Sequence, residues 1–193
     1  SGRNYEYFSE DPMLSNIMGT IICSTSQKYG NIAAPKHFAF NDQETHRQGV
    51  ATFVNEQAAR ELQLGALEGT FIPDEGGAMG TMTAFNRIGV KHVTYSEELL
   101  TNILRGEWGF EGYNITDFAF KELMYPYASM VAGTNAFDNM ISDFSAINAD
   151  TLAKDVKLLE AVRESCHRIL YTYVNSNAMN GVSSNSQVVS VTP

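Results

Sequence analysis

Basic residues are scarce in this chain of 193 residues. Lys and Arg together number 13 against 22 Asp and Glu, so the formal net charge is −9 and the pI is near 4.8. Such a surface repels phosphate backbones, and the few basic residues form no cluster or stripe along the chain. Nucleic acid is therefore excluded as an expected partner.

Long apolar runs are also missing. No uncharged apolar stretch approaches the ~18 residues that a membrane-spanning helix needs, and residues 1–6 lack the apolar core of a signal peptide. We therefore expect no contact with a membrane from this sequence. The cellular compartment stays unknown, because these absences carry less weight if the chain is a piece of a longer protein.

Cysteine and histidine are too few and too scattered for a metal site. Cys23 and Cys166 each lie among apolar neighbours in a predicted helix, which indicates buried free thiols. The histidines show neither HxH nor HxxxH spacing; they are His37, His46, His92 and His167. No glycine-rich phosphate loop follows a predicted strand. The sequence therefore implies no metal and no cofactor.

Apolar residues make up 44% of the chain, and their spacing alternates between that of helices and that of strands. The pattern predicts helices over residues 11–30, 53–71, 96–105 and 150–174. Between them it predicts short buried strands over residues 32–40, 78–85, 113–118 and 130–137. Strands that alternate with helices pair in parallel through helical crossovers, so the predicted fold class is α/β.

Polar residues stand at the C-terminal end of each predicted strand. They are Lys36, His37 and Asn41, then Asn86, Asp117 and Asp138. In (β/α)8 barrels the active site is built at this end of the strands, and a complete barrel takes about 250 residues. Only about four strand and helix pairs are predicted here. We therefore expect a partial (β/α)8 TIM barrel with its polar strand ends gathered in one place.

The end of the chain differs in composition from the rest. From residue 176 onward Asn, Ser and Gly dominate and apolar residues are few. This composition is typical of linkers. We therefore expect residues 1–175 to form the partial barrel domain and residues 176–193 to be a linker or a disordered tail.

Several motifs carry a resemblance to a known family. They are residues 2–12 (GRNYEYFSEDP), 36–47 (KHFAFNDQETHR), 60–62 (REL), 83–87 (TAFNR), 99–112 (LLTNILRGEWGFEG) and 115–117 (ITD). In this order and spacing they resemble glycoside hydrolase family 3, the β-glucosidase family. The resemblance implies a (β/α)8 catalytic barrel, of which this chain is the C-terminal part, roughly the last four to five β/α units. It also implies that a β-linked oligosaccharide or glycoside is the partner, and that its terminal sugar is released with retention of configuration.

The resemblance further implies roles for single residues. Asp117 corresponds to the nucleophilic carboxylate, and Arg3, Lys36 and His37 correspond to groups that hold the hydroxyls of the sugar. A retaining mechanism needs a carboxylate nucleophile and a protonated carboxyl about 5 to 5.5 Å away. Asp117 fills only the first role, and the resemblance implies that the acid is a Glu outside this chain. Without the motif, an aspartate after a strand is more often a loop or helix cap.

Two residues depart from the family pattern. Phe85 stands where a Tyr is common, which removes a hydroxyl near the nucleophile, and Phe118 stands where a Trp often follows it. Both are expected to belong to the sugar site, with a substrate preference different from that of the usual glucosidase. Glu44 and Arg47 are expected to pair with each other in support of the site.

Because the acid is expected outside this chain, we expect the isolated chain to show no or negligible turnover of a p-nitrophenyl β-glycoside. A second hypothesis assigns no activity to the chain. If the remaining strands and the acid are missing, the chain is a non-catalytic sugar-binding or assembly module. An incomplete barrel exposes edge strands and apolar helix faces, so self-association through these edges is a further expectation.

Overall fold

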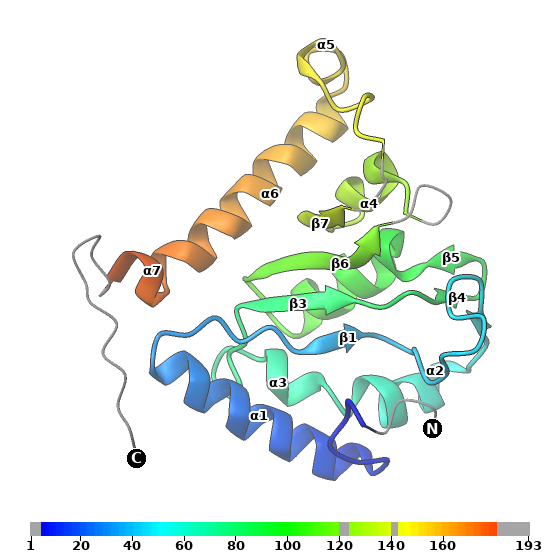
Figure 1. Cartoon of the computed structure of the whole chain (residues 1–193), viewed down its shortest axis with the longest axis vertical. Helices are drawn as coiled ribbons and strands as arrows, with labels where there is room; N and C mark the ends of the chain where they lie inside the picture. Colours follow the sequence, from blue (N-terminus) through cyan, green and yellow to red (C-terminus); the bar gives the residue numbers. More distant parts are fainter. Residues whose placement is uncertain (1–4, 120–123, 140–142, 181–193) are drawn as a thin grey trace.

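The computed structural model of the protein describes residues 5–119, 124–139 and 143–180. At its centre is a four-stranded parallel sheet with the strand order β1, β3, β6, β7 (Figure 1). These strands are β1 (Lys36–Phe38), β3 (Gly80–Thr83), β6 (Tyr113–Ala119) and β7 (Ala136–Asn139). Helical segments connect each strand to the next. The predicted α/β class with parallel strands is confirmed.

A second, smaller sheet lies beyond the C-terminal ends of β1 and β3 (Figure 1). It consists of β2 (Ala51–Thr52), β4 (Arg87–Ile88) and β5 (Lys91–His92), in the order β2, β4, β5. β2 and β4 are parallel, whereas β4 and β5 form a tight hairpin with Gly89 at φ 56°. Strands of two residues leave no periodic pattern, so the sequence does not predict them.

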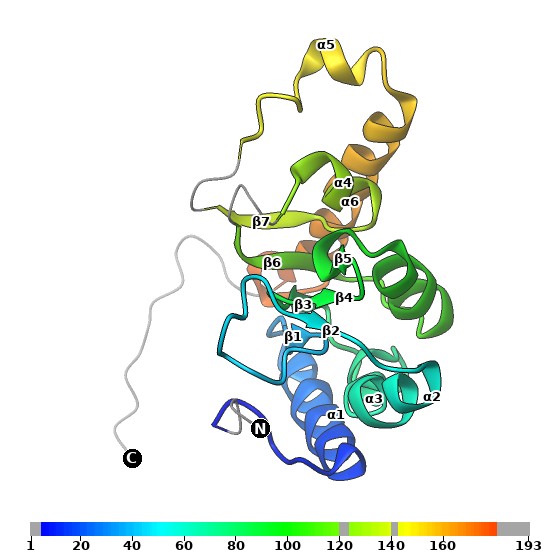
Figure 2. The ribbon, with the colours of Figure 1, turned by 90° about the vertical axis from the view of Figure 1, so that its right-hand side faces the viewer.

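Helices α1, α2 and α3 lie on one side of the central strands (Figure 2). The α-helices are α1 (Pro12–Lys28), α2 (Glu56–Ala58), α3 (Glu68–Phe71), α4 (Pro126–Val131), α5 (Ala149–Leu152), α6 (Val156–Val174) and α7 (Asn177–Asn180). There are also the π-helical segments η1 (Ala59–Leu64) and η3 (Glu98–Glu107) and the 3-10 turn η2 (Val93–Tyr95).

Local caps and turns decide where the helices begin and end. The first predicted helix is confirmed: the Asp11 carboxylate accepts a 2.9 Å hydrogen bond from the N–H of Leu14 and so caps α1. The predicted helix 53–71 is wrong in length, because a turn at Gly65 separates η1 from α3. The predicted helix 150–174 is likewise divided, because Asp155 caps α6 as a separate helix.

Two other predictions change near the end of the chain. The predicted strand 130–137 is wrong in its first half, because α4 continues to Val131 and Gly133, at φ 112°, makes a turn before β7. Within the predicted linker, residues 177–180 form the one-turn helix α7. Residues 181–193 lie outside the described part of the chain.

Four aromatic side chains form the centre of the main hydrophobic core. They are Phe38 on β1, Phe71 on α3, Trp108 and Phe110, each at most 6% exposed. The ring of Phe71 contacts the other three at centroid distances of 5.4 to 6.1 Å. Truncating a buried aromatic residue typically costs about 3–5 kcal/mol. The cluster therefore fixes β1 firmly against the helices.

Arg105 connects η3 to the starts of β6 and β7. Its guanidinium donates hydrogen bonds to the carbonyl oxygens of Phe110 and Gly112, at 3.2 and 3.0 Å, and to Asn135 Oδ1 at 2.7 Å. The same Asn135 oxygen accepts a hydrogen bond of 2.9 Å from the N–H of Asn114. Burial is the main cause that lowers the pKa of this guanidinium, to about 10. A cation at neutral pH therefore sets how β6 and β7 lie against η3.

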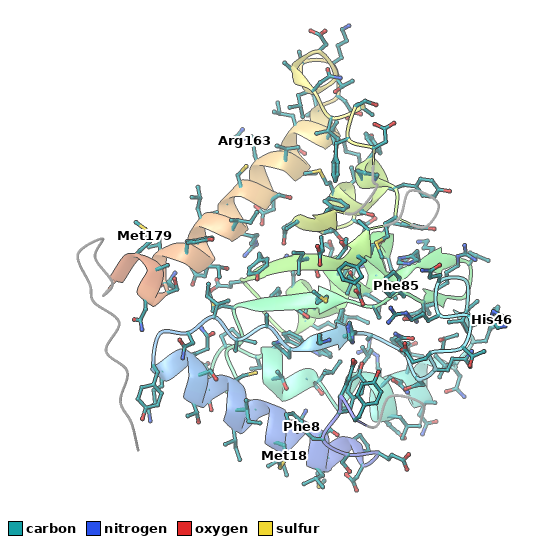
Figure 3. All side chains as sticks on the ribbon, viewed as in Figure 1. Phe8, Met18, His46, Phe85, Arg163 and Met179 are labelled. Atoms are coloured by element: carbon teal, nitrogen blue, oxygen red, sulfur yellow. The ribbon has the colours of Figure 1, made fainter. Side chains whose placement is uncertain are left out.

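Helix α1 carries its apolar side chains mainly on its outer face. Ser15, Gly19 and Cys23 are buried in the helix, which packs on α3. The other apolar residues of α1 are between 41% and 72% exposed; they are Met13, Leu14, Ile17, Met18, Ile21 and Ile22. Met18 projects away from the sheet (Figure 3). The apolar stripe that the spacing predicts is therefore exposed, and small residues form the buried contact.

The open edges of the sheet and the two cysteines are possible points of contact with other molecules. In the described part of the chain, β1 and β7 are the edge strands of the central sheet. Cys23 is buried, whereas Cys166 on α6 is exposed, so the prediction of a buried thiol is wrong for Cys166.

Within residues 5–119, 124–139 and 143–180, no helix is both long and apolar enough to cross a membrane. In the same residues, no group of three or more His, Cys, Asp or Glu side chains is placed to hold a metal ion.

Candidate active site

Two strands of the central sheet bring three predicted site residues together. Lys36 and His37 lie on β1 and Asp117 lies on β6, with β3 between them. Neighbouring strands are about 4.8 Å apart, so these side chains meet only by reaching across β3. His37 Nε2 lies 3.3 Å from Asp117 Oδ2, and Lys36 Nζ lies 3.3 Å from the same ring nitrogen. Asp117 and His37 are buried, whereas the Lys36 side chain is half exposed.

The surroundings of Asp117 keep its carboxyl ionised. Burial, the largest single influence, raises the pKa of this group. The hydrogen bond from His37, a 2.8 Å hydrogen bond from the N–H of Phe118, and the charges of His37 and Arg47 act in the opposite direction. Together they lower the pKa of Asp117 below its ordinary value of 3.8. A buried carboxylate that stays charged at neutral pH has the properties required of a nucleophile.

The segment before α1 contacts the Lys36–His37 pair. Glu6 Oε2 lies 3.6 Å from His37 Nδ1, and Glu6 Oε1 lies 4.0 Å from Lys36 Nζ. The hydroxyl of Tyr7 accepts a 3.1 Å hydrogen bond from the backbone N–H of His37. The imidazole ring therefore has a carboxylate beside each of its nitrogens, Glu6 at Nδ1 and Asp117 at Nε2.

Arg47 covers the ring of Phe85. Its guanidinium carbon lies 4.5 Å from the ring centroid, and its Nη1 lies 3.2 Å from Glu44 Oε2, so the predicted Glu44–Arg47 pair is present. Phe85 is completely buried near the strand ends (Figure 3), where it packs with Ala119, Met124 and Phe137. The ring supports Arg47 by a cation–π contact instead of lining an open surface. The place of Phe85 in the sugar site stays a prediction.

Comparison with known proteins identifies the family of this chain. The profile of the glycosyl hydrolase family 3 N-terminal domain matches residues 1–165. The chain belongs to glycoside hydrolase family 3.

Individual relatives are several times longer than this chain. It is 39% identical over 117 residues to β-glucosidase A of Butyrivibrio fibrisolvens, which is 61% of this chain and 14% of the relative. It is 31% identical over 180 residues to a β-glucosidase of Bacteroides ovatus, which is 92% of this chain and 24% of the relative. The chain therefore spans a quarter or less of the length of these two relatives.

Solved family 3 structures share the fold. β-glucosidase 3B of Thermotoga neapolitana superposes with a TM-score of 0.76 at 32% identity, over 93% of this chain and 26% of that one. The β-glucosidase of Bifidobacterium adolescentis superposes with a TM-score of 0.81 at 28% identity, over 98% of this chain and 27% of that one. The α/β fold with its parallel sheet is thus TIM-barrel-like and similar to the barrel domain of the family.

The other predicted site residues occupy different surroundings. Phe118 follows Asp117 and is 45% exposed, so an apolar ring beside the carboxylate is open to a ligand. Arg3 lies outside the described residues. Glu6 and Tyr7 lie in a motif that resembles the family, but no role is predicted for them from the sequence. Their contacts join residues about thirty positions apart, a separation at which local spacing gives no signal.

A cavity of about 990 Å³ lies between α1, η1 and β1. Glu6, Lys36 and His37 contribute to its wall, but Asp117 does not. Much of the remaining wall comes from α1 and from the chain leading into β1, so the cavity borders the open edge of the sheet. The candidate site is therefore defined by the ionic contacts around Asp117 and not by the size of this cavity.

Proposed function

We propose that this chain forms part of a retaining β-glycoside hydrolase in which Asp117 is the nucleophile. The observation that carries the proposal is the buried carboxylate of Asp117 on a parallel strand, 3.3 Å from His37 and with a lowered pKa. Family membership supports it, since the relatives named above are β-glucosidases. The C-terminal end of the strand is also the position at which TIM barrels carry catalytic residues.

The proposed reaction has two steps. A carboxylate oxygen of Asp117 attacks the anomeric carbon, the bond from this carbon to the glycosidic oxygen breaks, and an acid donates a proton to the leaving oxygen. Water then attacks the anomeric carbon of the glycosyl-enzyme intermediate and gives a proton back to the deprotonated acid, while the bond from this carbon to the Asp117 oxygen breaks; this releases the sugar and restores the carboxylate. Each step inverts the anomeric carbon, so the configuration is retained. We assign the acid to no residue of this chain and propose that it lies elsewhere in the complete enzyme.

The groups beside Asp117 suit recognition of sugar hydroxyls. Lys36 can donate hydrogen bonds, while His37 can both donate and accept them, and we extend the same binding role to Arg3. The exposed ring of Phe118 offers an apolar surface for a sugar face. Phe85 acts indirectly, by supporting Arg47. Two related β-glucosidases, from Thermotoga neapolitana and Kluyveromyces marxianus, have been solved with glucose, so a terminal β-glucosyl group is the first substrate to test.

The shape of the domain supports an incomplete barrel. The sheet has two edge strands in the described residues, β1 and β7, whereas a closed (β/α)8 barrel has none. The exposed apolar face of α1 is what a neighbouring helix of a complete barrel covers. We propose that residues 1–175 are the last four to five β/α units of the catalytic barrel, roughly half of the domain, and that residues 176–193 are a linker or tail outside it.

The alternative function is a sugar-binding or assembly module without activity. The small share of each relative that the chain spans favours this alternative. In that case the open sheet edges and the α1 face mediate self-association or assembly with other protein.

Leaving-group dependence distinguishes the two functions. A 2,4-dinitrophenyl β-glucoside needs little protonation of its leaving group, whereas an alkyl β-glucoside depends on the acid. We expect the chain to turn over the dinitrophenyl glucoside slowly and the p-nitrophenyl and alkyl glucosides negligibly. Binding of glucose without any turnover of the dinitrophenyl glucoside would favour the inactive module.

A further inference from the structure

The contacts of Glu6 and Tyr7 converge on the pair of residues proposed to bind the sugar. Glu6 faces both side chains of this pair, at 4.0 Å from Lys36 Nζ and 3.6 Å from His37 Nδ1. Tyr7 contacts the main chain of the same pair, through the N–H of His37. Glu6 therefore contacts the side chains of Lys36 and His37, and Tyr7 contacts the backbone of His37.

These contacts give the imidazole ring of His37 a defined orientation. The side chain is only 3% exposed, and a carboxylate lies beside each ring nitrogen. A flip of the ring would remove both contacts and place carbon atoms against Glu6 and Asp117. Working histidines are commonly oriented by a partner at their other ring nitrogen, which also selects where the protons lie. Glu6 is such a partner: it lies beside Nδ1, while the other ring nitrogen, Nε2, faces Asp117.

The ammonium group of Lys36 shows a second effect of Glu6. It lies 3.3 Å from His37 Nε2, the atom that also contacts Asp117. Asp117 is therefore a competing anion for Lys36, and an ion pair between them would occupy the oxygen that has to attack the sugar. The Lys36 side chain is 47% exposed, so its pair with Glu6 adds little to stability. The Glu6 carboxylate is a second anion within 4.0 Å of the ammonium group, on the side of the imidazole ring away from Asp117.

We propose that Glu6 and Tyr7 are positioning residues of the sugar site. Glu6 orients the His37 ring and keeps the Lys36 ammonium away from Asp117, and Tyr7 anchors the backbone of His37. This inference rests on the proposed function, in which Lys36 and His37 bind the sugar and Asp117 attacks it. Glu6 and Tyr7 act through these residues and do not take part in the bond changes.

The first experiment measures the ring of His37 by NMR in the complete 15N-labelled chain. We expect Glu6→Gln to move the Nδ1 signal of His37 and Tyr7→Phe, which removes only a hydroxyl, to move its backbone N–H signal. Glu160→Gln removes the same charge from the exposed surface of α6 and should move neither. A His37→Gln variant assigns the signals, and the ring signals of buried His92 report whether each variant is folded.

The second experiment measures turnover of the 2,4-dinitrophenyl β-glucoside by the same proteins. We expect Glu6→Gln to raise KM by about 10-fold, the lower end of the loss when an orienting partner is removed, with a smaller change in kcat. Glu6→Asp keeps the charge and should recover part of the loss. Glu160→Gln should match the wild type.

Together the experiments separate this proposal from the proposed function. If Glu6→Gln moves the His37 signals but Asp117→Asn leaves turnover unchanged, the positioning of His37 stands and the assigned nucleophile is wrong. If the His37 signals stay at their wild-type positions in both Glu6→Gln and Tyr7→Phe, the positioning role is overturned, whatever Asp117→Asn does. The NMR result decides the positioning role even when turnover is too slow to measure.

Discussion

The strand ends bury ionisable side chains, whereas helix α1 exposes apolar ones. At the strand ends, ionisable side chains such as His37 and Asp117 are buried, whereas on α1 apolar side chains such as Ile17 and Ile21 are about half exposed. Burying a charge costs several kcal/mol unless partners are placed around it. Exposed apolar surface forgoes roughly 25 cal/mol per Å² that burial would provide.

The two regions therefore suggest different uses. Buried ionisable groups in contact contribute little net stability, so the group around Asp117 fits the catalytic role that we propose for it. The face of α1 has no polar contacts to satisfy and gains free energy when another surface covers it. In the first region, His37 and Asp117 have polar partners within 3.6 Å. The second region is suited to a covering protein surface.

Replacing Asp117 tests the chemical side of this comparison and should have the largest effect. We expect Asp117→Asn, which keeps the size of the side chain, to slow turnover of the 2,4-dinitrophenyl β-glucoside by on the order of 10³-fold or more. Asp74→Asn changes an exposed turn and should leave the rate unchanged. Equal rates for wild type and Asp117→Asn would contradict a catalytic role for the buried carboxylate of Asp117.

Truncating Phe71 and Phe53 compares the stability contributed by a buried aromatic ring with that of an exposed one. Phe71 is 1% exposed and Phe53 is 81% exposed. We expect Phe71→Ala to lower the free energy of unfolding by about 3–5 kcal/mol and Phe53→Ala to change it by less than about 0.5 kcal/mol. Urea unfolding followed by circular dichroism measures both. Similar costs for the two variants would show that the aromatic cluster is not the core that holds β1.

Buried His92 makes the stability of the fold depend on pH. Burial is the main cause that lowers the pKa of His92 to about 4, from its ordinary value of 6.5. Between these values the unfolded chain binds a proton that the folded chain does not, so stability falls as the pH falls from 6.5 to 4. The loss should be on the order of 3 kcal/mol.

Unfolding midpoints across this pH range measure the effect of His92. We expect His92→Asn to flatten the pH dependence, whatever its effect on stability at neutral pH. His167 has a side chain that is 64% exposed, so His167→Asn should keep the wild-type slope. An unchanged slope in His92→Asn would contradict a buried, neutral imidazole.

Charges placed on α1 should have the smallest effect on folding. Because Ile17 and Ile21 are 49% and 59% exposed, we expect the double change to Glu to alter the free energy of unfolding by less than about 0.5 kcal/mol. Light scattering should show that the wild type associates and that the double variant shifts toward the monomer. Val90→Glu, at a position 87% exposed in the β4–β5 turn, should not shift it. A monomeric wild type would contradict self-association.

The sequence predicts the strand-end group better than it predicts the helices. Asp117, Lys36 and His37 are identifiable because a polar residue at the end of a short apolar run leaves a local signal and motifs surround it. The division of the helices at Gly65 and Asp155 depends on caps and turns that apolar spacing does not report.

Contacts over long separations stay hidden for a different reason. Glu6 meets His37 only because the segment before α1 folds back onto β1, and no local pattern encodes that return. The stacking of Arg47 on Phe85 also depends on how two loops meet. The exposed side of α1 could not be predicted either, because spacing identifies an apolar stripe without showing which surface covers it.

Covalent trapping tests the central claim most directly. A 2,4-dinitrophenyl 2-deoxy-2-fluoro-β-glucoside has an activated leaving group, while its fluorine slows hydrolysis of the glycosyl-enzyme intermediate. We expect mass spectrometry of the digested protein to find one fluoroglucosyl group, on Asp117, and to find none in Asp117→Asn. A label on another carboxylate, such as Glu6, or an undiminished label in Asp117→Asn would contradict the assignment of the nucleophile.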